Sequence, residues 1–348
     1  MTVGTHSAPQ TEAELDDRLS EPRDATVEAL RRAPGDIIVL GAGGKMGPTL
    51  ARMAVRAARS ADQQRTRRVI AVSRFGARAI AQQLEQHGVE TVPCDLLDAS
   101  SVARLPRAPN VIFMAGQKFG TTDAPSRTWM MNVVVPAYCA EHFADARIVA
   151  FSTGNVYPLV PVGGGGATES TTPAPVGEYA ASCLGRERVF EHYSVSRGTR
   201  VAIVRLNYAI DLRYGVLTDL AQRILRREPV PVAMGYVNVI WQGDANRAAL
   251  ELLPHAVSPP LVLNVSGVQT LAVRELASML GARLGVQPRF HGREAPDALL
   301  SNTTRFQQLL GAPEFPLETM LDWVADWVRS ERPLLGKPTH FETRDGAF

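Results

Sequence analysis

The feature that most constrains the fold is an alternation of short apolar runs with longer amphipathic stretches between residues 37 and 151. The apolar runs show no polar–apolar alternation, so each is expected to be a strand buried on both faces, as in a parallel sheet. The expected strands are Ile37–Leu40, Val69–Val72, Val89–Val92, Val111–Met114 and Ile148–Phe151. Helical patterns at Met46–Ala58, Ala77–Gln86, Ala99–Leu105 (a short turn) and Thr128–Phe143 separate them. This order predicts right-handed strand–helix–strand units and a doubly wound parallel α/β sheet.

The rest of the chain divides by composition into flanking parts. Residues 1–33 are polar and charged and predict an arm outside the sheet, with a helix near Thr26–Arg32. Residues 34–206 form the sheet domain, and they include a loop rich in Gly, Pro and Thr at Pro161–Pro175. Residues 207–332 are expected to form mainly a smaller substrate-binding lobe with returns to the sheet, and 333–348 a tail. Later elements are expected at Glu178–Ser196, Val201–Leu206, Asp219–Arg227, Gly243–Leu253, Val273–Leu284 and Leu317–Ser330.

Composition narrows the class of protein. The formal net charge is +2, which gives no strong field for binding nucleic acid or an anionic membrane. The 3 cysteines form no CxxC pair, and the histidines have no metal-ligand spacing, so we expect neither disulfides nor a metal site. No apolar run approaches the ~18 residues of a membrane span. The expectation is a cytoplasmic protein.

A glycine-rich turn follows the first strand directly. Gly41, Gly44 and Gly47 are spaced as GxxGxxG and run into an apolar helix, with Lys45 and Met46 inside the turn. Such a turn lets the backbone approach a pyrophosphate, which the amides and the dipole at the helix N-terminus stabilise. The turn therefore predicts a dinucleotide site on a Rossmann-type sheet.

The ends of the next strands suggest which dinucleotide binds. NAD sites usually carry an acidic residue at the end of the second strand, whereas Ser73 and Arg74 suit a 2′-phosphate. Lys45 would add positive charge nearby, so we expect NADP(H) to be favoured over NAD(H). The alternative is that Arg74 is an ordinary solvated arginine. Asp95 can accept from the adenine amino group, and the small residues Ala115 and Gly116 leave room for a cofactor at the fourth strand.

Hydroxyl side chains then gather at the fifth strand and the helix that follows. Thr153 ends the strand, where it can hydrogen-bond a substrate carbonyl. Tyr179, Cys183 and Arg186 share one helix face.

In these motifs the sequence resembles the extended short-chain dehydrogenase/reductases, the NAD-dependent epimerase/dehydratase family, whose best-known members act on nucleotide sugars. The resemblance covers about Asp36 to Val328. It rests on the glycine turn, Asp95-Leu96, Ala115-Gly116, Asn132, the Ser/Thr motif before Val156-Tyr157, Glu169, Tyr179, Arg205–Tyr208, Val237–Asp244, Leu263–Leu284 and Leu309–Gly311. It implies that Leu96, Asn132 and Tyr179 also contact the cofactor, and that Asn155, Tyr157, Asn207 and Trp241 contact the substrate.

One departure from the family pattern concerns catalysis. The family signature is YxxxK, and this chain reads Tyr179-x-x-x-Cys183. In the family the lysine lowers the pKa of the tyrosine, whereas a thiolate would raise it. Cys183 could be an inert buried residue, a participating thiol or the sign of a degenerate site, and Arg186 could supply the missing charge.

The resemblance leads to an NAD(P)-dependent epimerase/dehydratase-type oxidoreductase in which Tyr179 exchanges a proton and Thr153 polarises the same substrate oxygen. An NADPH-dependent carbonyl reductase of a secondary metabolite and a catalytically impaired sensor or scaffold remain alternatives. The two long helices, Thr128–Phe143 and Glu178–Ser196, carry surplus apolar residues and predict a homodimer. These residues are Val133, Val135, Tyr138, Val189, Phe190 and Tyr193.

Overall fold

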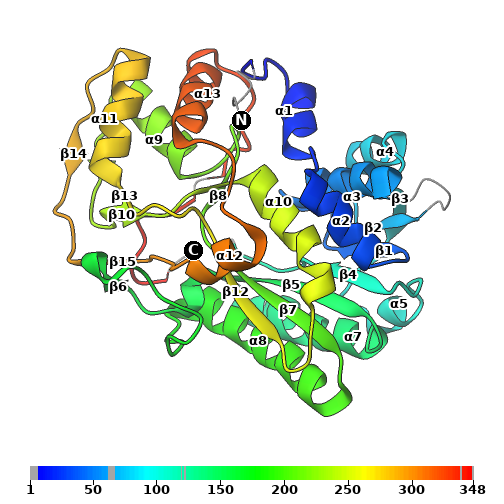
Figure 1. The fold of residues 1–348 in the computed structure, drawn as a ribbon. Helices are drawn as coiled ribbons and strands as arrows, with labels where there is room; N and C mark the ends of the chain where they lie inside the picture. The colour runs from blue at the N-terminus through cyan, green and yellow to red at the C-terminus, as the bar shows by residue number, and fades with distance from the viewer. Residues whose placement is uncertain (1–6, 62–66, 119, 121–122, 338, 347–348) are drawn as a thin grey trace.

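The protein is described by a computed structural model that covers residues 7–61, 67–118, 120, 123–337 and 339–346. A seven-stranded sheet in the order β12-β7-β5-β4-β1-β2-β3 lies at its centre, and all its pairings are parallel (Figure 1). Its strands are β1 (Ile37–Leu40), β2 (Val69–Ser73), β3 (Glu90–Pro93), β4 (Asn110–Phe113), β5 (Arg147–Thr153), β7 (Arg200–Leu206) and β12 (Leu261–Val265). The predicted Rossmann-type α/β sheet is confirmed.

Helices cover both faces of the sheet because successive strand residues point to opposite sides. Ile37 and Val39 of β1 face one apolar layer, and Ile38 and Leu40 face the other. The first layer is covered by α2 (Asp24–Arg32), α3 (Gly47–Ala61) and α10 (Gln242–Glu251). The second is covered by α5 (Ala99–Ala103), α7 (Val135–His142) and α8 (Gly177–Arg197). At the outer edge, α4 (Arg78–Gln86) precedes β3.

A second apolar core forms the smaller lobe, on the side of the molecule where Figure 1 places α9, α11 and α13. Its helices are α9 (Val216–Leu225), α11 (Val273–Leu284) and α13 (Leu317–Arg329), with α12 (Thr304–Leu310) against the sheet edge. Short strand pairs complete the lobe. They are β6 (Val160–Pro161) with β15 (Asp297–Ala298), β8 (Ala209–Ile210) with β11 (Ile240–Trp241), β9 (Val230–Pro231) with β14 (Phe290–His291), and β10 (Tyr236–Val237) with β13 (Leu271–Ala272).

The N-terminal arm is packed more closely than expected. It contains a further helix, α1 (Glu12–Leu19), whose Leu15 and Leu19 are fully buried in the lobe core. Arg23 pairs with the buried carboxylate of Glu251 at 2.6 Å. The arm therefore joins the lobe to the sheet domain. Residues 1–6 of the predicted arm lie outside the described residues.

The C-terminal stretch is also more than a tail. Phe341 is buried in the lobe core, and the Thr339 backbone N–H donates to Asp219 at 2.8 Å. The Leu335 N–H donates to the Arg213 carbonyl at 3.1 Å. We call residues 333–346 the C-terminal segment, of which residue 338 lies outside the described part of the chain, as do 347–348.

The predicted helix at Thr128–Phe143 is interrupted. It consists of α6 (Pro125–Trp129), a π-helical turn over Met130–Val134 and then α7. Such turns are rare and are often found at functional sites, because the extra residue redirects side chains. Here the turn contains Asn132, which is fully buried.

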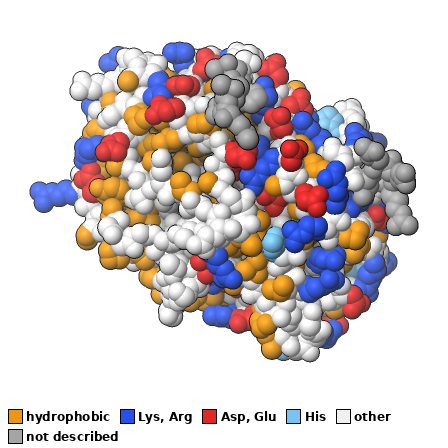
Figure 2. Space-filling model, viewed as in Figure 1, with side chains coloured by type: hydrophobic (Ala, Val, Ile, Leu, Met, Phe, Trp, Pro, Cys, Tyr) orange, Lys and Arg blue, Asp and Glu red, His pale blue; other side chains and the backbone are white. Residues whose placement is uncertain are grey.

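In the described part of the chain, none of the helices is both long and apolar enough to cross a membrane. The same residues contain no three histidine, cysteine or acidic side chains that are grouped as a metal ion would require. Charged side chains of both signs are dense on the right of Figure 2, over α1–α4, and sparser on the left.

Candidate functional site

A cavity of about 760 Å³ opens at the carboxyl ends of the central strands, between the sheet domain and the lobe. The glycine turn forms one wall, and the ends of β4 and β5 form its floor. The segment after β7 and the C-terminal segment form the opposite side. This is the crevice in which open α/β sheets bind ligands.

The predicted glycine turn is shaped by contacts that exclude side chains at some positions only. Gly41 has φ +89°, and a Cβ there would lie 2.6 Å from the Ala115 nitrogen. A Cβ at Gly47 would lie 2.3 Å from the Ala42 carbonyl oxygen. At Gly44, by contrast, the nearest atom would be 3.4 Å away, and this residue is exposed to the cavity. The turn is thus packed on its inner side and open toward the cavity.

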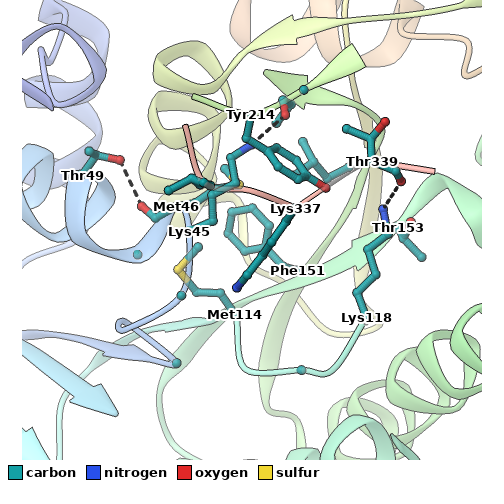
Figure 3. A pocket seen from close by; sticks show the side chains of 18 of the residues that line it. Lys45, Met46, Thr49, Met114, Lys118, Phe151, Thr153, Tyr214, Lys337 and Thr339 are labelled. Carbon is teal, nitrogen blue, oxygen red and sulfur yellow. Dashed lines mark hydrogen bonds between the residues drawn. The ribbon is translucent and has the colours of Figure 1, made fainter. Parts of the chain in front are cut away.

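Lys45 lies in the turn, but its side chain does not extend toward Ser73 and Arg74. This is contrary to the expectation from the sequence. Its ammonium donates to the Ala209 carbonyl at 3.0 Å and lies 3.9 Å from the centre of the Tyr214 ring, as Figure 3 shows. Burial lowers the pKa of Lys45 to about 8, against the opposing effect of Asp211. The charge of Lys45 therefore serves the lobe side of the cavity.

Most of the residues predicted to contact the adenosine part of the cofactor come directly after the strands β2 to β4. They do not belong to the cavity lining. Ser73 lies against the glycine turn, since a Cβ at Gly43 would be 2.5 Å from its hydroxyl. Arg74 and Asp95 are exposed, whereas Leu96 and Ala115 are buried. Arg74 and Asp95 are thus open to solvent beside the turn.

Asn132 lies behind the cavity wall rather than in it, in contrast to the expected cofactor contact. Its carbonyl oxygen accepts from the Gln117 backbone N–H at 2.9 Å and from Arg186 at 2.7 Å. Its amide group donates to the Gln117 carbonyl at 3.0 Å and to the Ser182 hydroxyl at 2.9 Å. Asn132 therefore fixes the loop after β4 to α8.

Thr153 and Tyr179 come together at the cavity floor, as predicted from their positions. The Asn155 backbone N–H donates to the Thr153 hydroxyl oxygen at 3.2 Å. Burial, the largest effect, and the neighbouring Cys183 raise the pKa of the Tyr179 phenol well above its usual value, while Arg186 and a hydrogen bond with Thr153 lower it. Tyr179 is therefore a neutral phenol at ordinary pH.

Cys183 and Arg186 support this pair from α8. Cys183 is fully buried next to Tyr179, and burial raises the pKa of its thiol. Arg186 lines the cavity, and its guanidinium donates to the Phe151 carbonyl at 2.8 Å as well as to Asn132. A Cβ at Gly116 would lie 2.4 Å from this guanidinium, which explains the glycine at the end of β4.

Two of the four predicted substrate residues line the cavity. These are Asn155 and Asn207. Tyr157 is instead buried, and its hydroxyl donates to Asn264 at 2.8 Å and accepts from Arg205 at 2.7 Å. Trp241 is buried as well, with its ring stacked on Phe315 at 4.5 Å between centroids. Tyr157 and Trp241 are thus buried, and neither lines this cavity.

Sequence reasoning missed several residues of the cavity. Lys118, from the loop after β4, and Lys337 and Thr339, from the C-terminal segment, have side chains directed into it (Figure 3). Arg213 and Tyr214 after β8 also line it, but they belong to the loop Asn207–Tyr214, which the sequence already predicts to contact the substrate. A signal was present in the sequence, since its only lysines are Lys45, Lys118 and Lys337.

The fold of this chain is similar to that of several solved structures. Solved structures with the same fold include UDP-glucose 4-epimerase from Thermotoga maritima, which is 19% identical with a TM-score of 0.69 over 85% of this chain and 99% of that one. Another is the dTDP-glucose 4,6-dehydratase DesIV from Streptomyces venezuelae, 21% identical with a TM-score of 0.71 over 85% and 97% of the two chains. A third is UDP-glucuronic acid 4-epimerase from Bacillus cereus, 17% identical with a TM-score of 0.70 over 85% and 99%.

At the level of sequence, no curated protein matches the chain. The model of the NAD dependent epimerase/dehydratase family does match it, over residues 37–250. That range begins at β1 and ends in α10, so it includes the glycine turn, Thr153 and Tyr179. The chain is a member of the NAD-dependent epimerase/dehydratase family of enzymes.

Proposed function

We propose that this enzyme is an NAD(P)-dependent oxidoreductase of the epimerase/dehydratase type that acts on a sugar or nucleotide-sugar-like substrate. The observation that carries the proposal is the hydrogen-bonded pair of Thr153 and Tyr179 on the floor of a cavity bounded by the glycine turn. The solved structures of similar fold bind UDP-glucose, or NAD together with a nucleotide.

The residues present fit a dinucleotide. The open side of Gly44 allows close approach to a pyrophosphate, and α3 directs its N-terminus at the same place. Arg74, exposed at the end of β2, can pair with a 2′-phosphate, so we propose NADP(H) as the favoured cofactor. When bound, the nicotinamide supplies the acceptor or donor of hydride.

The chain's own residues handle the proton. The Tyr179 phenol holds it and, as a neutral acid, can release it to a substrate oxygen when the attached carbon gains hydride. The Thr153 hydroxyl lies beside the phenol and can donate a hydrogen bond to the same oxygen. In the opposite direction the phenolate takes the proton back as the carbon loses hydride.

The cavity is large enough for a second ligand beside a cofactor, and its lobe side is cationic. Asn155 and Asn207 offer amide groups near Tyr179, and Lys45 and Lys337 bring positive charge farther out. Such a wall suits a polyol carrying a phosphate or diphosphate.

A carbonyl reductase is the second candidate. Its support is the raised pKa of Tyr179, because a phenol that stays protonated is set to donate a proton and thus to complete the reduction of a ketone. The two candidates differ in their stoichiometry, since a reductase consumes NADPH and an epimerase regenerates its cofactor.

The test is to incubate the protein with NADP+ or NADPH and a panel of UDP-sugars, dTDP-sugars and ketones, and to follow products by NMR and NADPH by absorbance. Product without net loss of NADPH supports an epimerase, and product with stoichiometric loss supports a reductase. Tyr179→Phe should lose most activity, while the matched control Tyr193→Phe on the same helix should keep it. Cofactor binding without turnover on any substrate would reject both candidates in favour of a sensor or scaffold.

A further inference from the structure

Lysine is rare in this chain, and its placement is selective. The sequence has 3 lysines and 34 arginines, and all three lysines line the cavity described above. Arginine serves the exposed ion pairs, such as Arg188 with Glu191 and Arg197 with Glu141. Lysine differs from arginine in being a compact charge whose pKa shifts readily on burial. The lysines in this cavity are therefore compact cations whose pKa can be shifted by burial, which arginine would not provide.

Lys118 occupies a well-defined position among the three. The backbone N–H of the neighbouring Gln117 donates to the Asn132 side-chain oxygen at 2.9 Å, and the Gln117 carbonyl accepts from the Asn132 amide group at 3.0 Å. The Lys118 ammonium donates to the Thr339 carbonyl at 3.3 Å. Thr339 is itself held by Asp219, which accepts from its N–H at 2.8 Å and from its hydroxyl at 2.6 Å. Lys118 is thus held at both ends, by Asn132 through the neighbouring backbone and by Thr339 at the ammonium. Figure 3 shows the contact with Thr339.

This ammonium lies in the same cavity as Tyr179 of α8. Lys118 and Cys183 are close enough to affect one another, because the thiol raises the pKa of Lys118 and the ammonium lowers that of Cys183. Burial has the larger effect on Lys118 and lowers its pKa to about 8. Cys183 in turn contacts Tyr179. A positive charge therefore lies near position 183, where α8 carries a cysteine instead of a cation.

Tyr179 needs such a charge in either direction of proton transfer. Each direction passes through a phenolate, and burial strongly disfavours this anion. Arg186 helps, but both of its terminal nitrogens are committed, one to the Phe151 carbonyl and the other to Asn132. Lys118 is a second cation that lowers the pKa of Cys183, and it lines the same cavity as Tyr179.

We propose that Lys118 supplies, from the loop after β4, the positive charge that stabilises the phenolate of Tyr179 in place of a cation at position 183. Lys118 acts through Tyr179 and is a positioning residue rather than a catalytic one. The inference rests on the proposed oxidoreductase function.

The pH dependence of this arrangement involves a small group of charges. Cys183 and Arg186 on α8 face Tyr179, and Glu187 on α8 affects Cys183 in addition. Asp219 on α9 raises the pKa of Lys118, while Lys118 and Lys45 repel one another. Every variant below is compared with wild type in the same buffers, so that these background charges cancel.

The first experiment measures kcat and KM against pH for wild type, Lys118→Met, Lys118→Arg and the matched control Lys337→Met. Below pH 8, where the ammonium is charged, Lys118→Met should lower kcat at least 30-fold with little change in KM, and this difference from wild type should shrink as the pH rises through about 8 and Lys118 of the wild type loses its proton. Lys118→Arg should recover a tenth or more of the activity. Lys337→Met also removes one charge from the cavity, but it should leave the position of the pH profile unchanged. Equal profiles for Lys118→Met and wild type would overturn the proposal.

A rescue variant tests the position of the charge. Cys183→Lys in the Lys118→Met background places a cation on α8 instead, and it should restore the wild-type pH profile at least in part. If this double variant is folded by circular dichroism but stays as impaired as Lys118→Met, the charge at this site does not act on Tyr179 and the proposal fails. Full activity in Tyr179→Phe would instead reject the proposed function, whatever Lys118 does.

The last readout does not depend on activity. The protein has three lysines, so ¹³Cε-lysine labelling gives three NMR titrations, which Lys→Arg variants assign. In cofactor-free protein the Lys118 midpoint should fall by about half a pH unit or more in Cys183→Lys, since a second cation would face it. The Lys337 midpoint should move less. An unmoved Lys118 midpoint would show that its ammonium does not face position 183.

Discussion

Glu187 of α8 and Arg205 of β7 form an ion pair at 2.6 Å, with side chains only 3% and 5% exposed. The Ser152 hydroxyl also donates to Glu187, and Arg205 donates to the Tyr157 hydroxyl at 2.7 Å. This pair ties the catalytic helix to the sheet directly below Thr153. It places Tyr179 and Thr153 on two elements that cannot move independently.

Breaking this pair on one side should be costly. Glu187→Leu leaves the Arg205 guanidinium buried without its counterion, so we expect a loss of about 3–5 kcal/mol in the free energy of unfolding. Glu187→Leu combined with Arg205→Met should cost less than the two single changes together, because no unpaired charge remains. Urea denaturation of the four proteins measures this coupling, and strictly additive costs would contradict it.

Two glycines of the turn should respond differently to a single added methyl group. Gly47→Ala forces a Cβ to 2.3 Å from the Ala42 carbonyl, so it should lower stability by about 1–3 kcal/mol. Gly44→Ala meets ordinary contact distances and should unfold like wild type. Its methyl group would nevertheless lie in the path of a pyrophosphate, so NADPH affinity should fall at least tenfold. Denaturation curves and fluorescence titrations separate the two effects, and full affinity in Gly44→Ala would place the cofactor elsewhere.

The preference for NADPH depends on Arg74. Loss of one charge-assisted contact of about 1.5–3 kcal/mol predicts that Arg74→Leu weakens NADPH binding roughly tenfold or more. NADH binding should be almost unchanged, because NADH has no 2′-phosphate. Arg78→Leu, an exposed arginine in the next helix, serves as the control. A wild-type protein that binds NADH as tightly as NADPH would refute the preference.

Cofactor binding should weaken above pH 8. Burial lowers the pKa of Lys45 and of Lys118 to about 8, so both ammoniums are charged at pH 7 and lose their protons as the pH rises through 8. The cavity then loses positive charge, and the Kd of anionic NADPH should rise roughly fivefold between pH 7 and 9.5. Lys45→Arg keeps one charge at all these values and should show a smaller rise. Isothermal titration gives the Kd at each pH, and a flat wild-type profile would contradict the expectation.

Assembly can be tested on the surface formed by Met130–Val134, α7 and α8. Val135 and Phe190 are buried in the sheet core, so they are not available to a partner. Val133 and Val189 remain partly exposed, and we propose that they lie in a homodimer contact. Val189→Glu should then yield a monomer by light scattering at micromolar concentration, while Val195→Glu, near the end of α8, should not. A monomeric wild-type protein would rule out the contact.

The parts of the fold that the sequence predicts are those set by local pattern. Continuous apolar runs identify six of the seven sheet strands, and the glycine spacing identifies the turn. Thr153 and Tyr179 are found because the strand end and the helix start bring them together. The motif positions of Tyr157 and Trp241 do not reveal that both are buried, because their burial depends on Asn264 and Phe315, far away in the sequence.

The lobe side of the cavity could not be predicted in this way. The C-terminal segment has no periodic pattern, and its position depends on separate contacts with Asp219, Arg213 and Tyr208. Lys118 lies in an irregular loop whose course depends on the side-chain bonds of Asn132. The one sequence signal for Lys118 and Lys337 was the scarcity of lysine. Scarcity alone does not predict that the three lysines line the same cavity.

The packing of the C-terminal segment also limits when the enzyme can become active during its synthesis. Gly346 lies against Val176 and Gly177 at the start of α8, and Thr339 completes the cavity wall. The sheet domain is translated much earlier, and domains generally fold as they emerge from the ribosome. A nascent chain in which residues 333–346 have not yet been made can therefore contain a folded sheet but not a finished cavity. The enzyme should acquire its activity only after this segment has been synthesised and has packed against α8.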